Sequence, residues 1–250
     1  AVGMSLCGKI PFASSFAMFA AGRSFEQVRN AIGYPHNNVK IGATHAGITV
    51  GEDGATHQCN EDIALMRTIP GMIILNPADD TEARLAVQAA IEHDGPVYLR
   101  FGRMAVPVYY GADYEFKIGK GVKMADGNDV ALIATGIEVE QALIARELLA
   151  ADGISASVVN ISTIKPLDEE LVVAEATRCG CVVTCEEHNI IGGLGGAVCE
   201  CLSEKKPTPV LRVGVQDVFG RSGPAKELIS YFGLDAASIA AKAKAAIALK

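Results

Sequence analysis

The 250-residue sequence lacks several features that would each indicate a particular class of protein. It has no Lys/Arg-rich run, and its formal net charge is −7, so it offers little to neutralise nucleic-acid phosphates. No apolar stretch is long enough to span a bilayer, and the first residues lack the charged region that opens a signal peptide. We therefore expect a cytoplasmic protein that acts on small molecules and binds neither nucleic acid nor membranes.

The usual signatures of metal, nucleotide and nucleophile sites are missing as well. The seven cysteines are an odd number, which favours reduced, buried and inert thiols over a disulfide framework. Cys179-x-Cys181 and Cys199-x-Cys201 lack the spacing typical of zinc sites, so we expect no metal site in this chain. The glycine run at 192–196 does not follow the G-x-G-x-x-G pattern, and close packing or a domain contact is its preferred interpretation.

Strand and helix patterns alternate in both halves of the chain, which is half hydrophobic and long enough for two domains. The expected strands lie at 39–41, 72–75, 97–101, 130–134, 156–161, 181–185 and 210–215. Such alternation indicates mainly parallel sheets, so we predict an α/β fold of two domains. The stretch 108–129 loses the pattern and is predicted as a linker with room for a hairpin. Ser24 and Gln27 are spaced like a capping box, and Asp79 or Asp80 is expected to cap a helix at 81–93.

A polar loop follows the first of the strands in the regular pattern, at 43–58 (A-T-H-A-G-I-T-V-G-E-D-G-A-T-H-Q). It carries His45, His57, the Glu52-Asp53 pair and three glycines. Glycines often mark only turns, and a single histidine or an acidic pair is often structural. Histidine is nevertheless the side chain best suited to proton transfer near neutral pH, and the combination favours a functional site at the carboxyl end of a strand.

Aromatic and arginine side chains lie near other strand ends. The segment 11–19 (P-F-A-S-S-F-A-M-F) is either an ordinary apolar element or a surface on which a flat heterocycle stacks. Arg100 and Arg103 come at the end of strand 97–101. An arginine there either forms a surface ion pair or binds a phosphate or carboxylate.

Several motifs of the chain resemble the C-terminal half of transketolase, a thiamine diphosphate enzyme. They are F-A-S-S-F-A-M-F, the loop 43–58, I-P-G-M-I-I-L-N-P-A-D, the Arg103 segment and E-E-H-N-I-I-G-G-L-G-G-A-V. They cover most of the chain in the same order, and the resemblance is greatest to bacterial transketolases split into two polypeptides. It implies a pyrimidine-binding domain at 1–115, a linker at 116–128 and a transketolase C-terminal domain at 129–250.

The resemblance also implies how the cofactor is shared. Phe16 and Phe19 match the aromatic walls of the aminopyrimidine pocket, with Phe19 stacking on the ring. A third aromatic residue of many transketolases is replaced by Gly22, and the family's essential glutamate would fall a few residues before Ala1. The Gly-Asp-Gly…Asn motif that binds the metal and diphosphate is absent. Thiamine diphosphate would thus be shared with a partner subunit that holds Mg²⁺ or Ca²⁺ by itself.

The substrate residues are assigned in the same way. By resemblance, His45 lies near the donor ketose and the cofactor, and His57 hydrogen-bonds the oxygen atoms of the donor. Asp53 binds the sugar hydroxyls, and Arg103 binds the sugar phosphate. Imidazoles suit a reaction that moves protons on hydroxyls and a carbonyl, and an arginine suits a phosphate.

The resemblance implies transfer of a two-carbon ketol unit from a ketose phosphate to an aldose phosphate. The chain would act with an N-terminal, diphosphate-binding subunit in a heterotetramer with two copies of each. Two enzyme alternatives remain. One is 1-deoxyxylulose-5-phosphate synthase, because Arg100-x-x-Arg103 resembles the arginine pattern of that enzyme. The other is the β subunit of a 2-oxo acid dehydrogenase. A-T-H-A-G with both histidines favours transketolase. A non-catalytic assembly or regulatory subunit is a third alternative, motivated by the missing glutamate.

Overall fold

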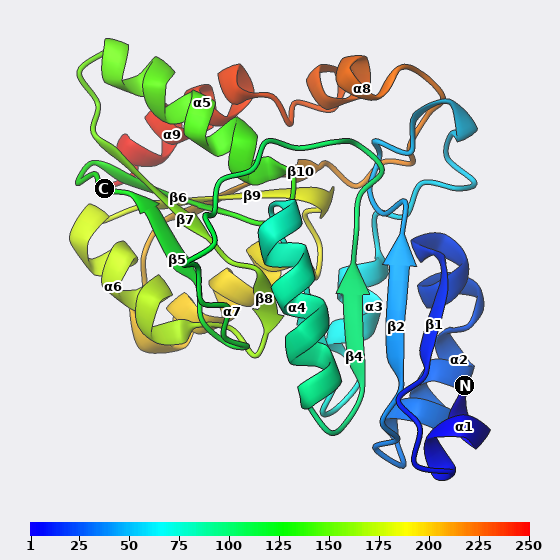
Figure 1. Ribbon diagram of the computed structural model, residues 1–250. Helices are drawn as coiled ribbons and strands as arrows, with labels where there is room; N and C mark the ends of the chain where they lie inside the picture. Colours follow the sequence, from blue (N-terminus) through cyan, green and yellow to red (C-terminus); the bar gives the residue numbers. More distant parts are fainter.

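The computed structural model describes residues 1–250 as two five-stranded sheets with helices on their faces (Figure 1). Most neighbouring strands run parallel, which confirms the predicted α/β fold. The N-terminus lies in the half built on the first sheet, and the C-terminus lies in the half built on the second. None of the helices combines the length and the apolar character needed to cross a membrane.

The first sheet has the strand order β1-β2-β4-β3-β8. Its strands are β1 (Phe12–Phe16), β2 (Lys40–Thr44), β3 (Ile73–Leu75), β4 (Val97–Arg100) and β8 (Thr163–Lys165). The first four are parallel, and β8 is antiparallel to β3. β1 forms one edge of the sheet, and four of its five residues are exposed. This edge is therefore open on the surface of the chain.

Helices cover both faces of the first sheet. They are α1 (Val2–Leu6), π-helical turns at Met18–Arg23 and Val28–Gly33, α2 (Phe25–Gln27), α3 (Asp62–Arg67) and α4 (Asp80–Glu92). Asp79 caps α4 by accepting a hydrogen bond from the Glu82 amide at 2.7 Å, as predicted. The predicted capping box of Ser24 and Gln27 does not form. The Ser24 hydroxyl donates instead to the Phe19 carbonyl and makes no cap hydrogen bond.

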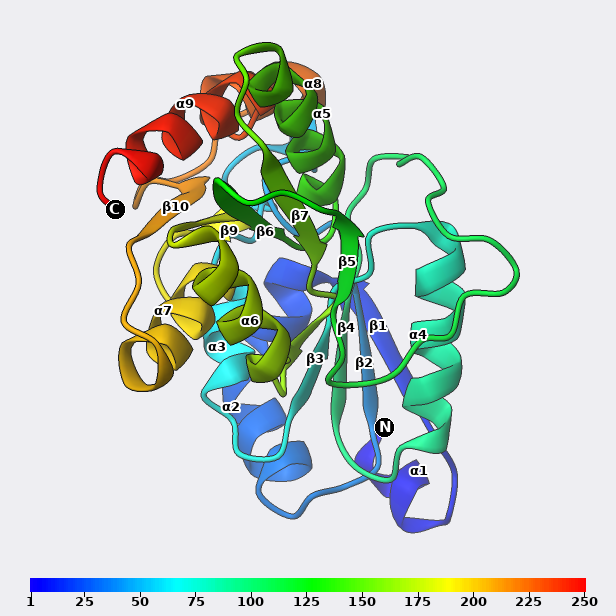
Figure 2. The ribbon, with the colours of Figure 1, turned by 90° about the vertical axis from the view of Figure 1, so that its left-hand side faces the viewer.

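The second sheet has the strand order β10-β9-β6-β7-β5, and helices lie on both of its faces (Figure 2). Its strands are β5 (Val122–Ala125), β6 (Val130–Ala134), β7 (Ala156–Asn160), β9 (Val182–Asn189) and β10 (Val210–Val215). Its helices are α5 (Glu138–Ala151), α6 (Glu169–Cys179), α7 (Leu194–Lys205), α8 (Ala225–Tyr231) and α9 (Ala236–Ile247). Only β5 is antiparallel, to β7.

Two strands, β5 and β8, form where the sequence pattern did not indicate them. β5 lies inside the predicted linker and pairs with β7 of the second sheet, so no hairpin forms there. β8 follows β7 in the chain but joins the first sheet, where Leu75 pairs with Thr163. Because β8 crosses between the halves, the domain limits at 115 and 129 stay a prediction.

Ile48 links the loop 43–58 to the core of the second half. It is fully buried and belongs to the cluster formed by β6, β9, α5 and α9, although its loop leaves the first sheet. The loop and the second half therefore pack against each other.

Five of the seven cysteines are buried, whereas Cys7 is exposed and Cys199 is half-buried.

Ile48→Ala should lower the free energy of unfolding by about 2–5 kcal/mol, because it leaves a cavity in a closely packed core. Urea unfolding followed by circular dichroism measures this change. Ile144→Ala is the matched control, because Ile144 on α5 is 45% exposed and its loss should cost within about 0.5 kcal/mol. Equal effects of the two substitutions would contradict the packing described for Ile48.

Candidate active site

The loop 43–58 leaves β2 at the edge of the first sheet where the parallel strands end. The register places Phe16 of β1 beside Thr44 of β2, and Ala43 beside Arg100 of β4. His45 takes a positive φ of 57°, a backbone conformation that non-glycine residues seldom adopt outside turns and functional sites. The side chains predicted for a site thus gather at one sheet edge.

Two phenylalanines and two histidines form one cluster. The ring of Phe16 stacks on His45 with centroids 3.9 Å apart and planes inclined by 9°. Phe19 lies 6.1 Å from Phe16, and His57 meets Phe19 edge-on at 5.4 Å. All four side chains are half-buried. The structure therefore brings together the residues that the sequence assigns separately to a cofactor and to a substrate.

Each histidine is held by the threonine that precedes it. The Nδ1 atom of His45 lies 2.9 Å from the Thr44 hydroxyl, and Nδ1 of His57 lies 3.0 Å from the Thr56 hydroxyl. Neither Nε2 atom has a hydrogen-bond partner in the chain. The hydrogen bond at Nδ1 orients each imidazole, and the unpartnered Nε2 atom of each ring remains available to a ligand.

Asp53 is an exposed residue of the loop, and Arg103, which follows β4, contacts the loop there. The Arg103 guanidinium donates to the Val50 carbonyl and lies 3.7 Å from the Asp53 carboxylate and 3.8 Å from Glu52. The side chains of Arg103 and Asp53 are both 46% exposed. Such a loose, solvated pair is weak enough to separate when a ligand competes for either group.

Arg100, the other arginine of this segment, is buried in an ion pair. Its Nε atom donates to Asp62 Oδ2 at 2.8 Å, and its Nη2 atom donates to Asp62 Oδ1 at 3.2 Å. The Tyr98 hydroxyl donates to the same Oδ2 at 2.8 Å. Arg100 also donates to the backbone carbonyl of Glu187, in the second half, at 2.9 Å. It therefore connects the halves and is not exposed to a ligand.

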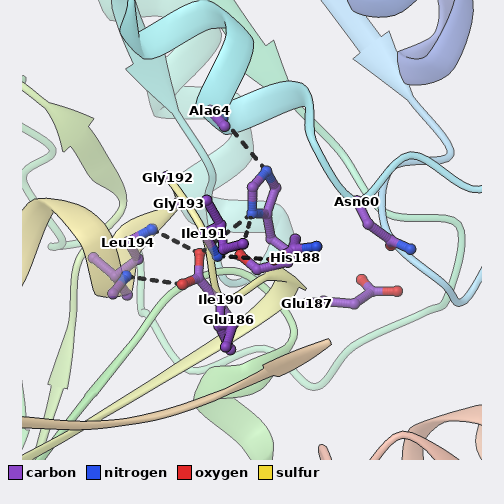
Figure 3. A network of polar contacts seen from close by, with 12 residues as sticks. Asn60, Ala64, Glu186, Glu187, His188, Ile190, Ile191, Gly192, Gly193 and Leu194 are labelled. Carbon is purple, nitrogen blue, oxygen red and sulfur yellow. Dashed lines mark hydrogen bonds and ion pairs between the residues drawn. The ribbon is translucent and has the colours of Figure 1, made fainter. Parts of the chain in front are cut away.

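His188 lies beside this ion pair, with its Nε2 atom 4.0 Å from Asp62 Oδ1. Figure 3 shows its ring next to Ala64. Its Nδ1 atom donates to the Asn189 carbonyl at 2.7 Å, and its Nε2 atom accepts from the Ala64 amide at 3.4 Å. Both ring nitrogens are thus used by the neutral imidazole. Burial lowers the pKa of His188 to about 4, so the ring is uncharged at neutral pH.

The neutral His188 makes folding stability depend on pH. Between pH 6.5 and about 4 the unfolded chain protonates this ring and the folded chain does not, so stability falls as the pH falls through that window. His188→Gln should reduce the loss of stability between pH 7 and pH 5 by about 1–2 kcal/mol in urea unfolding. Burial raises the pKa of Glu186 to about 7, which acts in the opposite direction, but in both proteins alike. Equal losses in both would contradict a neutral His188.

A cavity of about 750 Å³ opens beside the cluster, between the two halves. Phe19, Arg23 and Thr56 line it from the first half, and Asn189 and Phe219 from the second. Half-buried aromatic rings beside an open cavity fit a planar heterocycle. No group of three or more His, Cys, Asp or Glu side chains is arranged to hold a metal ion. The aromatic rings beside this cavity therefore offer a surface on which a planar ligand could stack.

The buried residues behind this site were not evident from the sequence. Asp62, Glu187 and His188 were not assigned a role, although Glu187 and His188 belong to a run of three titratable residues near the carboxyl end of the apolar strand β9. Charged side chains at that position in a parallel sheet often face a ligand or another domain. The glycine run was interpreted correctly, because Gly192 packs against Ala64 and its carbonyl accepts from Arg67 at 2.8 Å.

Comparison with known proteins gives the family. Residues 1–108 match the transketolase pyrimidine binding domain, and residues 119–239 match the transketolase C-terminal domain. A chain of Methanocaldococcus jannaschii, provisionally named a transketolase C-terminal section, is 52% identical over 96% of this chain and 76% of its own length. The 6-deoxy-6-sulfo-D-fructose transketolase subunit SqwH of Clostridium sp. is 44% identical over 96% of this chain and 74% of its own.

A solved structure and a more distant relative complete the comparison. A split gene transketolase, described as an inactive beta4 tetramer, is 50% identical and covers all of this chain and 80% of its own, with a TM-score of 0.94. The 1-deoxy-D-xylulose-5-phosphate synthase 1 of Geobacter sulfurreducens is 38% identical, but the match covers only 40% of that enzyme. The chain therefore belongs to the transketolase family, as one subunit of a split transketolase.

Proposed function

We propose that this chain is the C-terminal subunit of an active ketol transferase. With its partner it moves a two-carbon ketol unit from a ketose phosphate to an aldose phosphate. The observation that carries the proposal is the pair of threonine-held histidines, His45 and His57, whose free Nε2 atoms share one cluster with Phe16 and Phe19. Two oriented imidazoles beside an aromatic surface suit a reaction that moves protons next to a planar cofactor.

The cofactor of the transketolase family is thiamine diphosphate, which supplies, when bound, the carbon that carries the two-carbon unit. Phe16 and Phe19 would hold its aminopyrimidine ring, with Phe19 stacking on it. The diphosphate end of the cofactor and its Mg²⁺ or Ca²⁺ would be held by the N-terminal, diphosphate-binding subunit. The inactive tetramer of the related split transketolase supports a need for this partner, and we propose a heterotetramer with two copies of each chain.

The substrate would be bound by three residues of the loop 43–58 and by Arg103 after β4. His57 would hydrogen-bond the oxygen atoms of the donor and exchange a proton with them, and His45 would lie against the reacting end of the ketose. Asp53 would accept hydrogen bonds from sugar hydroxyls. Arg103, with its half-exposed guanidinium, would bind the sugar phosphate.

The geometry also bears on the alternatives. The pattern Arg100-x-x-Arg103 favours a synthase of 1-deoxyxylulose 5-phosphate only if both arginines reach the ligand. Arg100 is 3% exposed and paired with Asp62, which leaves Arg103 alone for a phosphate. The β subunit of a 2-oxo acid dehydrogenase and a non-catalytic assembly subunit remain as further candidates, and assay with different donors separates them.

The test mixes the full-length chain with its separately produced partner subunit, thiamine diphosphate and Mg²⁺. A coupled assay follows transfer from a ketose phosphate to an aldose phosphate. We expect turnover with the ketose phosphate only in the mixture. Turnover with pyruvate that requires the aldose phosphate as acceptor would support the synthase. Decarboxylation of a 2-oxo acid without any aldose phosphate would support the dehydrogenase subunit. No turnover with any donor would support the assembly subunit.

A further inference from the structure

Glu187 belongs to β9 of the second half, but its carboxylate contacts the loop 43–58 of the first half. The Thr49 amide donates to Glu187 Oε1 at 2.6 Å, across 138 residues of sequence. Glu187 is 3% exposed and Thr49 is 1% exposed, so water does not compete for this bond. Figure 3 shows Glu186 directed toward Leu194, whereas Glu187 lies apart from that network, on the side of Asn60.

The loop is built to receive this carboxylate. Gly47 has a φ of +79°, and a Cβ atom there would overlap the Glu187 carboxyl group. The absence of a side chain at Gly47 therefore gives Glu187 its place beneath the loop. Glu187 is itself held, because its backbone carbonyl accepts from Arg100 at 2.9 Å.

The bond acts at the middle of the segment that carries the site. Thr49 lies between His45 on one side and Asp53 and His57 on the other, and Ile48 beside it is anchored in the second core. Next to His57 in the chain, the side-chain Nε2 of Gln58 donates to the Ile48 carbonyl at 2.8 Å and to the Arg221 carbonyl at 2.9 Å. The carboxyl group of Glu187 is thus one of several contacts that hold this part of the loop in place.

We propose that Glu187 is a positioning residue for the site: its buried carboxylate holds the Thr49 amide and thereby fixes the loop that presents His45, Asp53 and His57. The proposal extends the function proposed above and assigns to the second half a part in ketol transfer, although none of its residues need touch the substrate. Fixing both histidines in place matters because small misplacements of reacting groups lower rates strongly.

Glu186 provides a matched control. It is the preceding residue of β9, is a buried glutamate like Glu187, and accepts no hydrogen bond from the loop. Its carboxylate accepts instead from the Leu194 amide at 2.6 Å and the Gly195 amide at 2.8 Å, at the start of α7. Removing Glu186 therefore disturbs the same strand without releasing the loop.

The first experiment measures hydrogen exchange in the full-length chain, bound to its partner subunit, for Glu187→Ala and Glu186→Ala. In Glu187→Ala, amides in the segment 46–50 should exchange about 10-fold faster or more, the factor expected when a buried amide loses its hydrogen bond. In Glu186→Ala, faster exchange should be confined to the start of α7. Equal acceleration of 46–50 in both variants, or in neither, would overturn the proposal, whatever reaction the enzyme catalyses.

The second experiment measures steady-state kinetics on the same complexes. Glu187→Ala should lower kcat/KM for the ketose phosphate about 10- to 100-fold while the affinity for thiamine diphosphate stays near that of the unaltered enzyme. Glu187→Gln keeps one acceptor oxygen and the side-chain volume, so it should restore part of this loss. An equal loss for Glu186→Ala, or no rescue by glutamine, would mean a merely structural role. Absence of turnover in the unaltered complex would instead count against the proposed function, and the exchange result would still decide the role of Glu187.

Discussion

His57→Ala is expected to lower kcat of the two-subunit enzyme by about 10²–10⁴-fold, the range typical of losing a positioned acid or base. The Nδ1 atom of His57 is held by Thr56, and its Nε2 atom is free to act on the substrate. Its edge contact with Phe19 contributes only modestly to holding a cofactor ring. We therefore expect the affinity for thiamine diphosphate to change far less than turnover, and steady-state kinetics with calorimetric cofactor titration measures both.

His36→Ala is the matched control for this prediction. His36 is exposed and lies beside Gly71 and Gly95, which precede β3 and β4 at the opposite edge of the first sheet. Its removal should leave both kcat and cofactor affinity unchanged. If His57→Ala behaved like His36→Ala, the assignment of His57 to the reaction would be wrong.

Arg100→Met should lower the free energy of unfolding by about 3–5 kcal/mol. The substitution leaves the Asp62 carboxylate fully buried without its cation and removes the bond from Arg100 to the Glu187 carbonyl. Burial is the largest single effect on the pKa of Asp62 and would raise it, but the charge and hydrogen bonds of Arg100, together with the hydrogen bond from Tyr98, lower that pKa overall. Urea unfolding at neutral pH measures the loss.

Two further variants isolate the stranded charge as the cause. Arg84→Met removes an exposed arginine that pairs with Asp80 within α4, and it should leave stability nearly unchanged. Asp62→Asn combined with Arg100→Met removes the uncompensated carboxylate and should recover much of the loss. A double variant no more stable than Arg100→Met would show that the charge is not what destabilises the protein.

Much of the fold could be predicted because it depends on local patterns. Buried strands such as Val130–Ala134 read as apolar runs between turns, and Asp79 is spaced as a helix cap. The loop 43–58 stood out because histidines, acids and glycines follow a strand directly. The resemblance to transketolase named its residues, and the structure places Phe16, Phe19, His45 and His57 in one cluster.

What the sequence did not reveal depends on contacts between distant segments. β8 has only three residues, and its pairing with β3 joins positions about ninety residues apart, such as Leu75 and Thr163. The bond between Glu187 and Thr49 likewise connects two halves whose relative placement no local pattern encodes. Ser24 is a local exception: its hydroxyl donates to the Phe19 carbonyl in the preceding turn and does not cap the helix.

Titration of this chain into a fixed amount of its partner subunit tests most directly whether the two chains build one active site. Ketol transfer from a ketose phosphate is measured at each ratio, with thiamine diphosphate and Mg²⁺ in excess. We expect no turnover from either chain alone, and a rise that saturates at one copy of this chain for each partner chain. Turnover by the partner alone that is unchanged by this chain, or none at any ratio, would contradict a shared site.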